Sequence, residues 1–190
     1  MTGPRFTAAV VTAQVLAQIG TFTLPALLPA FIARWSLSGA EAGWLIGAFF
    51  AAYVVAVPVL VALTDRVPAR RIYMTGTALT ALSHAGFALF ADGFWTALAL
   101  RLLAGAGWAG CYMPGLKVLA DRLEGAEQSR AVGLHSMCGY AGGFLGPVIA
   151  GFALDAAGPG HLMGWALAFG HIAPVTLLGL WALRRLGRGR

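Results

Sequence analysis

Long apolar stretches separated by short polar breaks run along the entire chain. They cover about residues 6–31, 42–64, 71–91, 94–120, 131–154 and 162–183. A helix needs roughly 20 apolar residues to cross a hydrocarbon core about 30 Å thick, and these runs are too long and continuous for barrel strands. The pattern predicts an all-α membrane protein, in which residues 1–190 form a single bundle of six transmembrane helices. The loops are too short to hold a soluble domain.

Composition supports this prediction. Hydrophobic residues make up 59% of the chain and charged residues 11%, against about 25% charged in soluble proteins. The first apolar stretch is as long as a full span and no small-residue cleavage site follows it, so we expect it to remain as a helix. Cys111 and Cys138 lie within apolar stretches, where cysteine is usually a small buried residue.

Basic residues are distributed unevenly among the loops. Apart from Arg34 and Arg101, all of the 13 lysines and arginines lie at the chain ends or in loops of one side. By the positive-inside rule, both termini and the hairpin between the second and third stretches are expected in the cytoplasm. The net charge of +6 then reflects topology, so no nucleic-acid partner is expected. Abundant arginine, alanine and glycine indicate a GC-rich genome, which favours the inner membrane of a bacterium.

Two glutamines interrupt the first apolar stretch. Gln14 and Gln18 lie one helical turn apart on one face, and Pro25 and Pro29 can bend the outer half. Polar side chains within a membrane are costly unless they face a partner or a wet cavity. The pair is interpreted either as part of a solute-binding cavity or as an interhelical hydrogen-bonding pair.

The fourth stretch places Arg101, Trp108 and Tyr112 on one helical face. Arg101 lies about 10 Å from the outer helix end at 1.5 Å per residue, so it is expected to point inward, although snorkelling to the interface is an alternative. A guanidinium there could bind an anionic solute or donate to backbone carbonyls. With Gln14 and Gln18, these residues are the candidate solute contacts.

His135 is the candidate proton relay because it lies in the fifth stretch beside a row of small residues. The alternative is a structural, hydrogen-bonded histidine. His84 and His171 are interpreted as structural, since we find no other polar residue on their helical faces. No Asp or Glu lies in the middle of any span, so a coupling carboxylate would have to come from outside this chain.

The sequence lacks the motifs of several enzyme and pump families. There is no Gly-x-Ser-x-Gly, no His-Glu-x-x-His and no Walker A lysine loop. We therefore expect neither an enzyme nor an ATP-driven pump within this chain. Cysteine and methionine near His135 do not follow a recognised metal-site spacing, so neither a metal nor a cofactor is expected.

Three motifs together resemble those of the major facilitator superfamily of secondary transporters. The hairpin resembles its Gly-x-Leu-Ala-Asp-Arg-x-Gly-Arg-Arg motif through Leu63, Asp65, Arg66 and Arg70. The fourth stretch resembles Arg-x-x-x-Gly-x-Gly through Arg101, Gly105 and Gly107. The fifth stretch resembles the family's antiporter motif through Gly142, Gly146, Pro147 and Gly151. They occur in the family's order along the chain.

The resemblance implies a secondary transporter that works by alternating access between two six-helix bundles, each built from inverted triplets. This chain resembles the N-terminal bundle. The motif aspartate would hold the cytoplasmic gate shut against a helix of the other bundle, and the fifth-helix motif slightly favours an antiporter or exporter. The expected partners are a small-molecule substrate, the lipid bilayer and a second six-helix half, either a missing C-terminal half or a second copy. A non-transporting six-helix assembly partner is the alternative.

Overall fold

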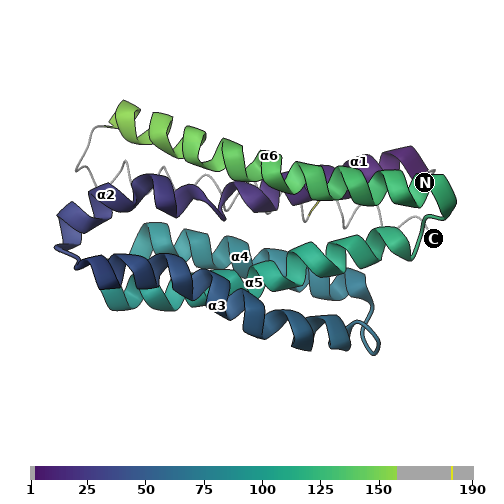
Figure 1. The fold of residues 1–190 in the computed structure, drawn as a ribbon, viewed down its shortest axis with the longest axis horizontal. Helices are drawn as coiled ribbons and strands as arrows, with labels where there is room; N and C mark the ends of the chain where they lie inside the picture. Colours follow the sequence, from purple (N-terminus) through teal and green to yellow (C-terminus); the bar gives the residue numbers. More distant parts are fainter. Residues whose placement is uncertain (1–2, 158–180, 182–190) are drawn as a thin grey trace.

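The computed structural model describes residues 3–157 and residue 181, and all regular structure in this part is helical (Figure 1). The predicted span at 162–183 lies outside the described residues, apart from Trp181. The helices are α1 (Gly3–Ile19), α2 (Thr23–Trp35), α3 (Gly39–Leu63), α4 (Ala69–Phe90), α5 (Phe94–Ala120) and α6 (Gly125–Ala157).

Two helical segments in the described part are long and apolar enough to cross a membrane. They run from Pro4 to Trp35 and from Gly39 to Leu63. The remaining helices have sufficient length, but α4 buries several polar side chains, Thr77, Thr80 and Ser83 among them. Polar residues that face other helices lower the mean hydropathy of a span without exposing it to lipid. The six-span count itself stays a prediction.

The first predicted stretch is divided into two helices. Residues 20–22 form a turn between α1 and α2, where the prediction had one bent span at 6–31. Proline has no N–H, and its ring clashes with the carbonyl four residues earlier. For Pro25 that carbonyl belongs to Thr21, so the proline explains why the α1 hydrogen-bonding pattern stops here.

Helix α3 begins at a capping box and ends at the charged hairpin. The Ser38 side chain accepts from the Glu41 N–H at 3.3 Å, and the Ser38 N–H donates to Glu41 Oε2 at 2.8 Å. At the other end, the N–H groups of residues 64–67 fold back onto carbonyls of residues 61–63. Pro68 is then the N-cap residue of α4 and has no side-chain capping hydrogen bond.

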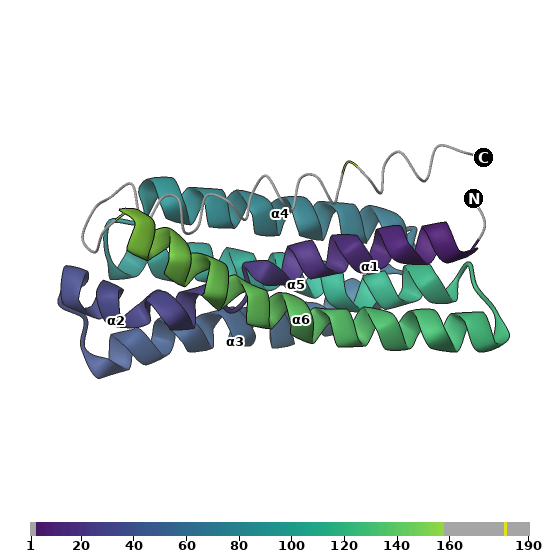
Figure 2. The same cartoon turned by 90° about the horizontal axis from the view of Figure 1, so that it is seen from above.

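The helices form two layers. Helix α5 packs closely against α3 and α4, whereas α6 packs against α1 and α2. Figure 1 shows α1, α2 and α6 in one layer and α3, α4 and α5 in the other, and Figure 2 shows the same helices from above. The contacts of α5 with α1 and α6 are sparser, and α2 and α1 also touch α3 and α4, so α5 is the main but not the sole helix at which the layers meet.

Glycines let the helices of the α3/α4/α5 layer approach closely. A Cβ at Gly76 of α4 would lie 2.7 Å from the Gly107 carbonyl oxygen of α5, and one at Gly105 would lie 2.0 Å from the Phe49 carbonyl oxygen of α3. Thr77 and Thr80 return their hydroxyls to their own helix, at 2.7 and 2.9 Å. Main chain therefore packs on main chain, with the polar groups satisfied locally.

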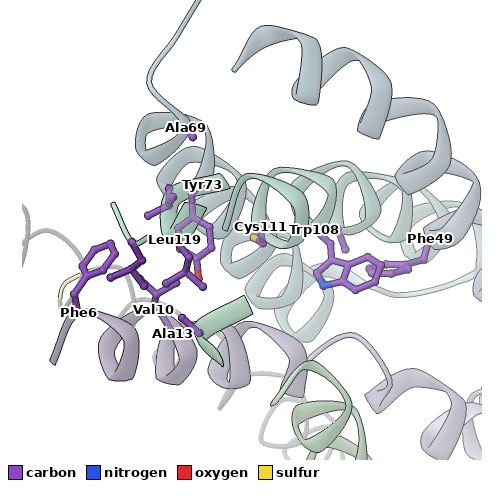
Figure 3. Packing of buried hydrophobic residues seen from close by; sticks show 13 residues of the cluster. Phe6, Val10, Ala13, Phe49, Ala69, Tyr73, Trp108, Cys111 and Leu119 are labelled. Atoms are coloured by element: carbon purple, nitrogen blue, oxygen red, sulfur yellow. The ribbon is translucent and has the colours of Figure 1, made fainter. Parts of the chain in front are cut away.

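Larger apolar side chains fill the space between the two layers. Phe6, Val10 and Ala13 of α1 belong to one buried cluster with Tyr73 of α4 and Leu119 of α5. Figure 3 shows this cluster continuing through Cys111 and Trp108 to Phe49. The interior between the layers therefore mixes aromatic and aliphatic side chains near the start of α1 and is mainly aromatic around Trp108.

Candidate functional site

Gln18 joins the two layers through its side-chain oxygen. The indole Nε1–H of Trp108, on α5, donates to Gln18 Oε1. The Thr21 hydroxyl donates to the same oxygen at 3.3 Å. Gln18 is 4% exposed, and a buried indole N–H needs an acceptor of this kind. The contact fixes the Trp108 ring against the turn that separates α1 from α2.

Trp108 is the centre of an aromatic cluster. Its ring centroid lies 4.4 Å from that of Tyr53, 5.5 Å from that of Phe49 and 6.0 Å from that of Tyr112. All three contacts are tilted, an arrangement that aromatic quadrupoles favour over face-to-face stacking. The cluster draws on α3 and α5 and holds the indole rigidly in place.

A pocket of about 200 Å³ lies beside this cluster. Its lining combines residues from α1, the following turn, α5 and α6, namely Gln18, Phe22, Trp108, Tyr112, Ser136 and Tyr140. Three of the five predicted solute contacts, Gln18, Trp108 and Tyr112, therefore come together around one cavity. The side chains that line it offer amide and hydroxyl groups on an aromatic wall.

Arg101 is buried outside that pocket. It is 2% exposed, its Nε donates to the Leu45 carbonyl at 3.2 Å, and its guanidinium carbon lies 4.5 Å from the Phe49 ring centroid. Its Nη1 is buried without a hydrogen-bond partner among the described residues. The inward orientation agrees with the prediction, and the carbonyl contact attaches α5 to α3.

Gln14 and His135 are fully buried and also lie outside the lining of the pocket. Neither polar atom of the Gln14 amide has a hydrogen-bond partner among the described residues. The His135 ring lies 5.7 Å from the Tyr112 ring, and its nitrogens form no well-aligned hydrogen bond there, although the Tyr112 main chain lies near. Gln14 thus shares a helical face with Gln18 without sharing its pocket.

Tyr73 is a neighbour of His135 that the sequence analysis did not single out. A Cβ at Gly115 would lie 2.8 Å from His135 Cε1 and 3.0 Å from Tyr73 Cε2. The Tyr73 hydroxyl is buried without a well-aligned partner. Tyr73 lies near the start of α4 and belongs to none of the three motifs. The sequence therefore did not indicate that it lies near His135.

The charged hairpin lies at the surface. Leu63, Asp65 and Arg66 are exposed, whereas Arg70, in the first turn of α4, is half-buried. The structure records no ion pair between Asp65 and another described residue, so the hairpin's four motif residues are not gathered into one internal cluster. The Asp65 carboxylate faces outward, where it is accessible to another molecule or domain.

The antiporter motif of the fifth apolar stretch lies in α6, and two of its glycines have a packing role. A Cβ at Gly142 would lie 2.4 Å from Gln18 Cβ, and one at Gly146 would lie 1.9 Å from the Ile19 carbonyl oxygen. Pro147 follows directly, within α6. A Cβ at Gly151 would meet nothing within 4 Å. The motif therefore brings α6 onto α1 next to the pocket, and Gly151 takes no part in that contact.

His84 has polar neighbours that the sequence analysis overlooked. Its Nδ1 lies 2.8 Å from the Thr80 carbonyl and its Nε2 lies 3.1 Å from the Gly20 carbonyl, in the turn between α1 and α2. Thr77 and Thr80 are buried on the same helix. The structural interpretation of His84 agrees with these contacts, but its stated reason was wrong, because threonines four and seven residues earlier share the face. His171 lies outside the described residues.

The comparisons with known proteins agree with this arrangement. The family model of the Major Facilitator Superfamily matches residues 10–189. The "Uncharacterized MFS-type transporter YwoD" of Bacillus subtilis (strain 168) is 30% identical over 149 residues, which are 78% of this chain and 32% of that protein.

Solved structures share the fold at lower identity. One is a bacterial homologue of the human lysosomal transporter Spinster, in an inward-facing and occupied conformation, with a TM-score of 0.83 and 23% identity over 97% of this chain and 44% of that one. Another is the POT family transporter PepTSo, with a TM-score of 0.83 and 16% identity over 100% of this chain and 38% of that one. The chain spans about a third to under half the length of these relatives. Because the family model covers almost the whole chain, the chain belongs to the Major Facilitator Superfamily.

Proposed function

We propose that this chain is the N-terminal half of a secondary active transporter that moves a small solute by alternating access. The single observation that carries the proposal is the pocket between the two layers, where Gln18, Trp108 and Tyr112 converge. Transporters of this family bind solute at the interface of two bundles near the bilayer midplane. The second bundle would be supplied by a C-terminal half or by another copy, since the chain covers 32% of its bacterial relative.

Membrane orientation follows from the charges. In the proposal both termini and the α3–α4 hairpin face the cytoplasm of a bacterium, and the bundle lies in the inner membrane. The basic residues that support this include Arg66, Arg70 and Arg71 at the hairpin and Arg122 and Arg130 near the α5–α6 loop. Accessibility of cysteines introduced at the hairpin to a membrane-impermeant reagent tests the assignment.

The hairpin is the proposed cytoplasmic gate. The exposed carboxylate of Asp65, with Leu63, Arg66 and Arg70 around the turn, would meet a helix N-terminus of the second half, where an anion is stabilised by about 0.3–1 kcal/mol. Asp65→Asn removes that charge and should shift the protein toward the inward-open state. Cytoplasmic cysteine accessibility should rise, and unchanged accessibility would count against the gate.

Arg101 and His135 are proposed to act in coupling rather than in direct solute binding, because both are buried away from the pocket lining. The His135 ring lies against Tyr112, which does line the pocket. Protonation of the imidazole would therefore be linked to the binding of a solute in the pocket. Arg101→Ala should abolish transport while leaving insertion intact. Substitution of His135 by Asn should remove proton dependence, and normal proton-driven transport by that variant would exclude the relay.

The direction of transport is proposed to be export by exchange. The close approach of α6 to α1 at Gly142 and Gly146 supports a functional role for the motif that is typical of antiporters. Counterflow in proteoliposomes, with an imposed proton gradient of either sign, distinguishes exchange from uptake.

A non-transporting assembly partner is the alternative function. Its support is the exposed apolar face of α6, where Met137, Tyr140, Phe144 and Phe152 are each at least 70% exposed. The intact protein, reconstituted and tested on a panel of solutes, separates the two functions. Binding and movement of a solute support the carrier, and a complete failure of both supports the assembly role.

A further inference from the structure

We propose that the pocket selects neutral aromatic solutes that carry a carbonyl oxygen, and that the side-chain N–H of Gln18 binds that oxygen. The inference rests on the proposed function and names the chemical class of its solute. It follows from the orientation of one amide, from the absence of charge in the pocket lining and from the pocket's size.

The Gln18 amide can adopt only one orientation in this contact. The Trp108 indole nitrogen is a donor and never an acceptor, so it must face Oε1 rather than the amide nitrogen. Thr21 places a second donor on the same oxygen. A flipped amide would set two N–H groups against each other. The side-chain oxygen of Gln18 therefore already accepts two hydrogen bonds. The amide N–H groups remain available to a solute in the pocket that Gln18 lines.

None of the described residues that line the pocket carries a formal charge. Its six residues are Gln18, Phe22, Trp108, Tyr112, Ser136 and Tyr140, whereas Arg101 and His135 lie elsewhere. The part of a solute held by these six residues would, if charged, give up its hydration without gaining a counterion from them, which is far more costly than desolvating a neutral polar group. Cation binding on the Trp108 ring is disfavoured as well, because that side chain is only 9% exposed and is covered by Tyr53.

The size and the aromatic lining of the pocket favour a solute with one flat ring. The cavity of about 200 Å³ is smaller than the roughly 300–1,000 Å³ that holds a drug-sized ligand. It fits one ring and its substituent, while any remaining part of the solute would extend toward the second half. The Phe22, Tyr112 and Tyr140 side chains in the lining offer a flat ring the tilted contacts that aromatic groups prefer.

A matched set of single-ring probes tests the proposal on the intact wild-type protein in proteoliposomes. Benzamide has the acceptor and no charge, toluene lacks the acceptor, benzylammonium is a cation and benzoate is an anion. Saturation-transfer NMR with competition ranks their affinities. Benzamide should bind about threefold to tenfold more tightly than toluene, the worth of one hydrogen bond, and more tightly than either ion. Equal or tighter binding of benzylammonium or benzoate would overturn the proposal.

Two variants locate the donor. Gln18→Met keeps the length of the side chain and removes its polar atoms, so benzamide should fall to the affinity of toluene while toluene itself is unchanged. Ser136→Ala is the matched control in the same lining, and it should leave the ratio of the two affinities as it was. A ratio that collapses in Ser136→Ala and survives in Gln18→Met would show that the serine is the donor and overturn the role of Gln18.

The wild-type ranking needs no variant, so misfolding of Gln18→Met leaves the proposal testable. Its failure also differs from that of the proposed function. If an ion is transported and outcompetes benzamide, the selectivity is wrong and the carrier stands. If benzamide binds in the predicted rank but no solute moves in any assay, the pocket chemistry stands and the carrier fails.

Discussion

Helices meet in two different ways in this bundle. Within the α3/α4/α5 layer, α4 and α5 touch through their main chains, and a Cβ at Gly76 would lie only 2.7 Å from the Gly107 carbonyl oxygen. Between the layers, contact is made by long side chains such as Trp108, which reaches Gln18, and His84, which reaches the Gly20 carbonyl. The first kind of interface leaves no room for a side chain at Gly76, although an apolar cavity of about 320 Å³ opens beside it among residues of α3, α4 and α5. The second kind leaves the pocket that Gln18 and Ser136 line with polar groups.

The main-chain interface accounts for rigidity, whereas the side-chain interface between the layers provides a place for binding. Interfaces of small residues fix the distance between two helices, because there is no side chain whose rotamer could change. An interface of long side chains keeps its helices further apart. The polar groups among those side chains must either find hydrogen-bond partners or stay buried without them. Gln14, Tyr73 and His135 retain buried polar atoms without well-aligned partners in this region. Buried groups of this kind are costly, and they occur where a transporter would need polar function.

The largest effect should come from the main-chain interface between α4 and α5. Gly76→Val would force a branched side chain against the main chain of Gly107 and Gly110. Overpacking typically costs about 1–3 kcal/mol, and we expect the upper end because a backbone cannot rotate away. The free energy of unfolding in detergent, measured by SDS titration, checks this expectation.

Gly86→Val on the same helix is its control. The nearest atom to a Cβ there is the Leu100 Cδ2 at 3.0 Å, at the end of a flexible side chain. The control should lose much less stability than Gly76→Val. Equal losses would mean that the α4–α5 interface is no more rigid than the rest of the bundle.

A smaller loss is expected where α6 meets α1. Gly146→Ala would place a Cβ 1.9 Å from the Ile19 carbonyl oxygen. Because α6 packs mainly on α1 and α2, we expect it to shift away more easily than α5, which packs between α3 and α4. We expect a cost of about 1–2 kcal/mol, with a change in transport because the displaced helix carries Ser136 and Tyr140 of the pocket. Gly151→Ala, in open space, should change neither quantity, and an effect as large as that of Gly146→Ala would refute the packing role.

The sequence predicts this interface better than it predicts the pocket. Small residues at helical spacing, as at Gly142 and Gly146, indicate a close approach from one helix alone. The depth of Arg101 along its helix likewise indicated that it points inward. The break after α1 exceeds the predicted bend, and the turn is also in contact with His84, 64 residues away, whose Nε2 lies 3.1 Å from the Gly20 carbonyl. No local pattern shows that contact.

Pairing across the layers needs the register between helices, and no periodicity supplies it. Gln14 and Gln18 look equivalent in the sequence, yet only Gln18 meets Trp108, 90 residues later. Tyr53 and Phe22 carried no polar or motif signal, although one covers Trp108 and the other lines the pocket. These contacts depend on which turn of one helix faces which turn of the next, and packing decides that.

The hydrogen bond of His84 across the layers should be worth less than either glycine interface. His84→Phe keeps a ring of similar shape and removes both ring nitrogens, Nε2 at 3.1 Å from the Gly20 carbonyl and Nδ1 at 2.8 Å from the Thr80 carbonyl. Interhelical hydrogen bonds in membranes contribute about 0.6–2 kcal/mol, so we expect a loss near 1 kcal/mol in the same titration. Ser83→Ala removes a bond that stays within α4, from the Ser83 hydroxyl to the Thr80 carbonyl. If the two variants behave alike, the contact between the layers has no special value.

The smallest change in stability should follow from Thr21→Val. The substitution is nearly isosteric and removes the weaker of the two donors to Gln18 Oε1, at 3.3 Å. Stability should fall by about 0.5–1 kcal/mol at most, because the Trp108 indole still holds the oxygen. That remaining bond keeps the amide oriented, so the preference for benzamide over toluene should persist. Adding Trp108→Phe removes the second donor and frees the amide to flip, and the preference should then fall. A preference already lost in Thr21→Val would show that the threonine, rather than the indole, orients the amide.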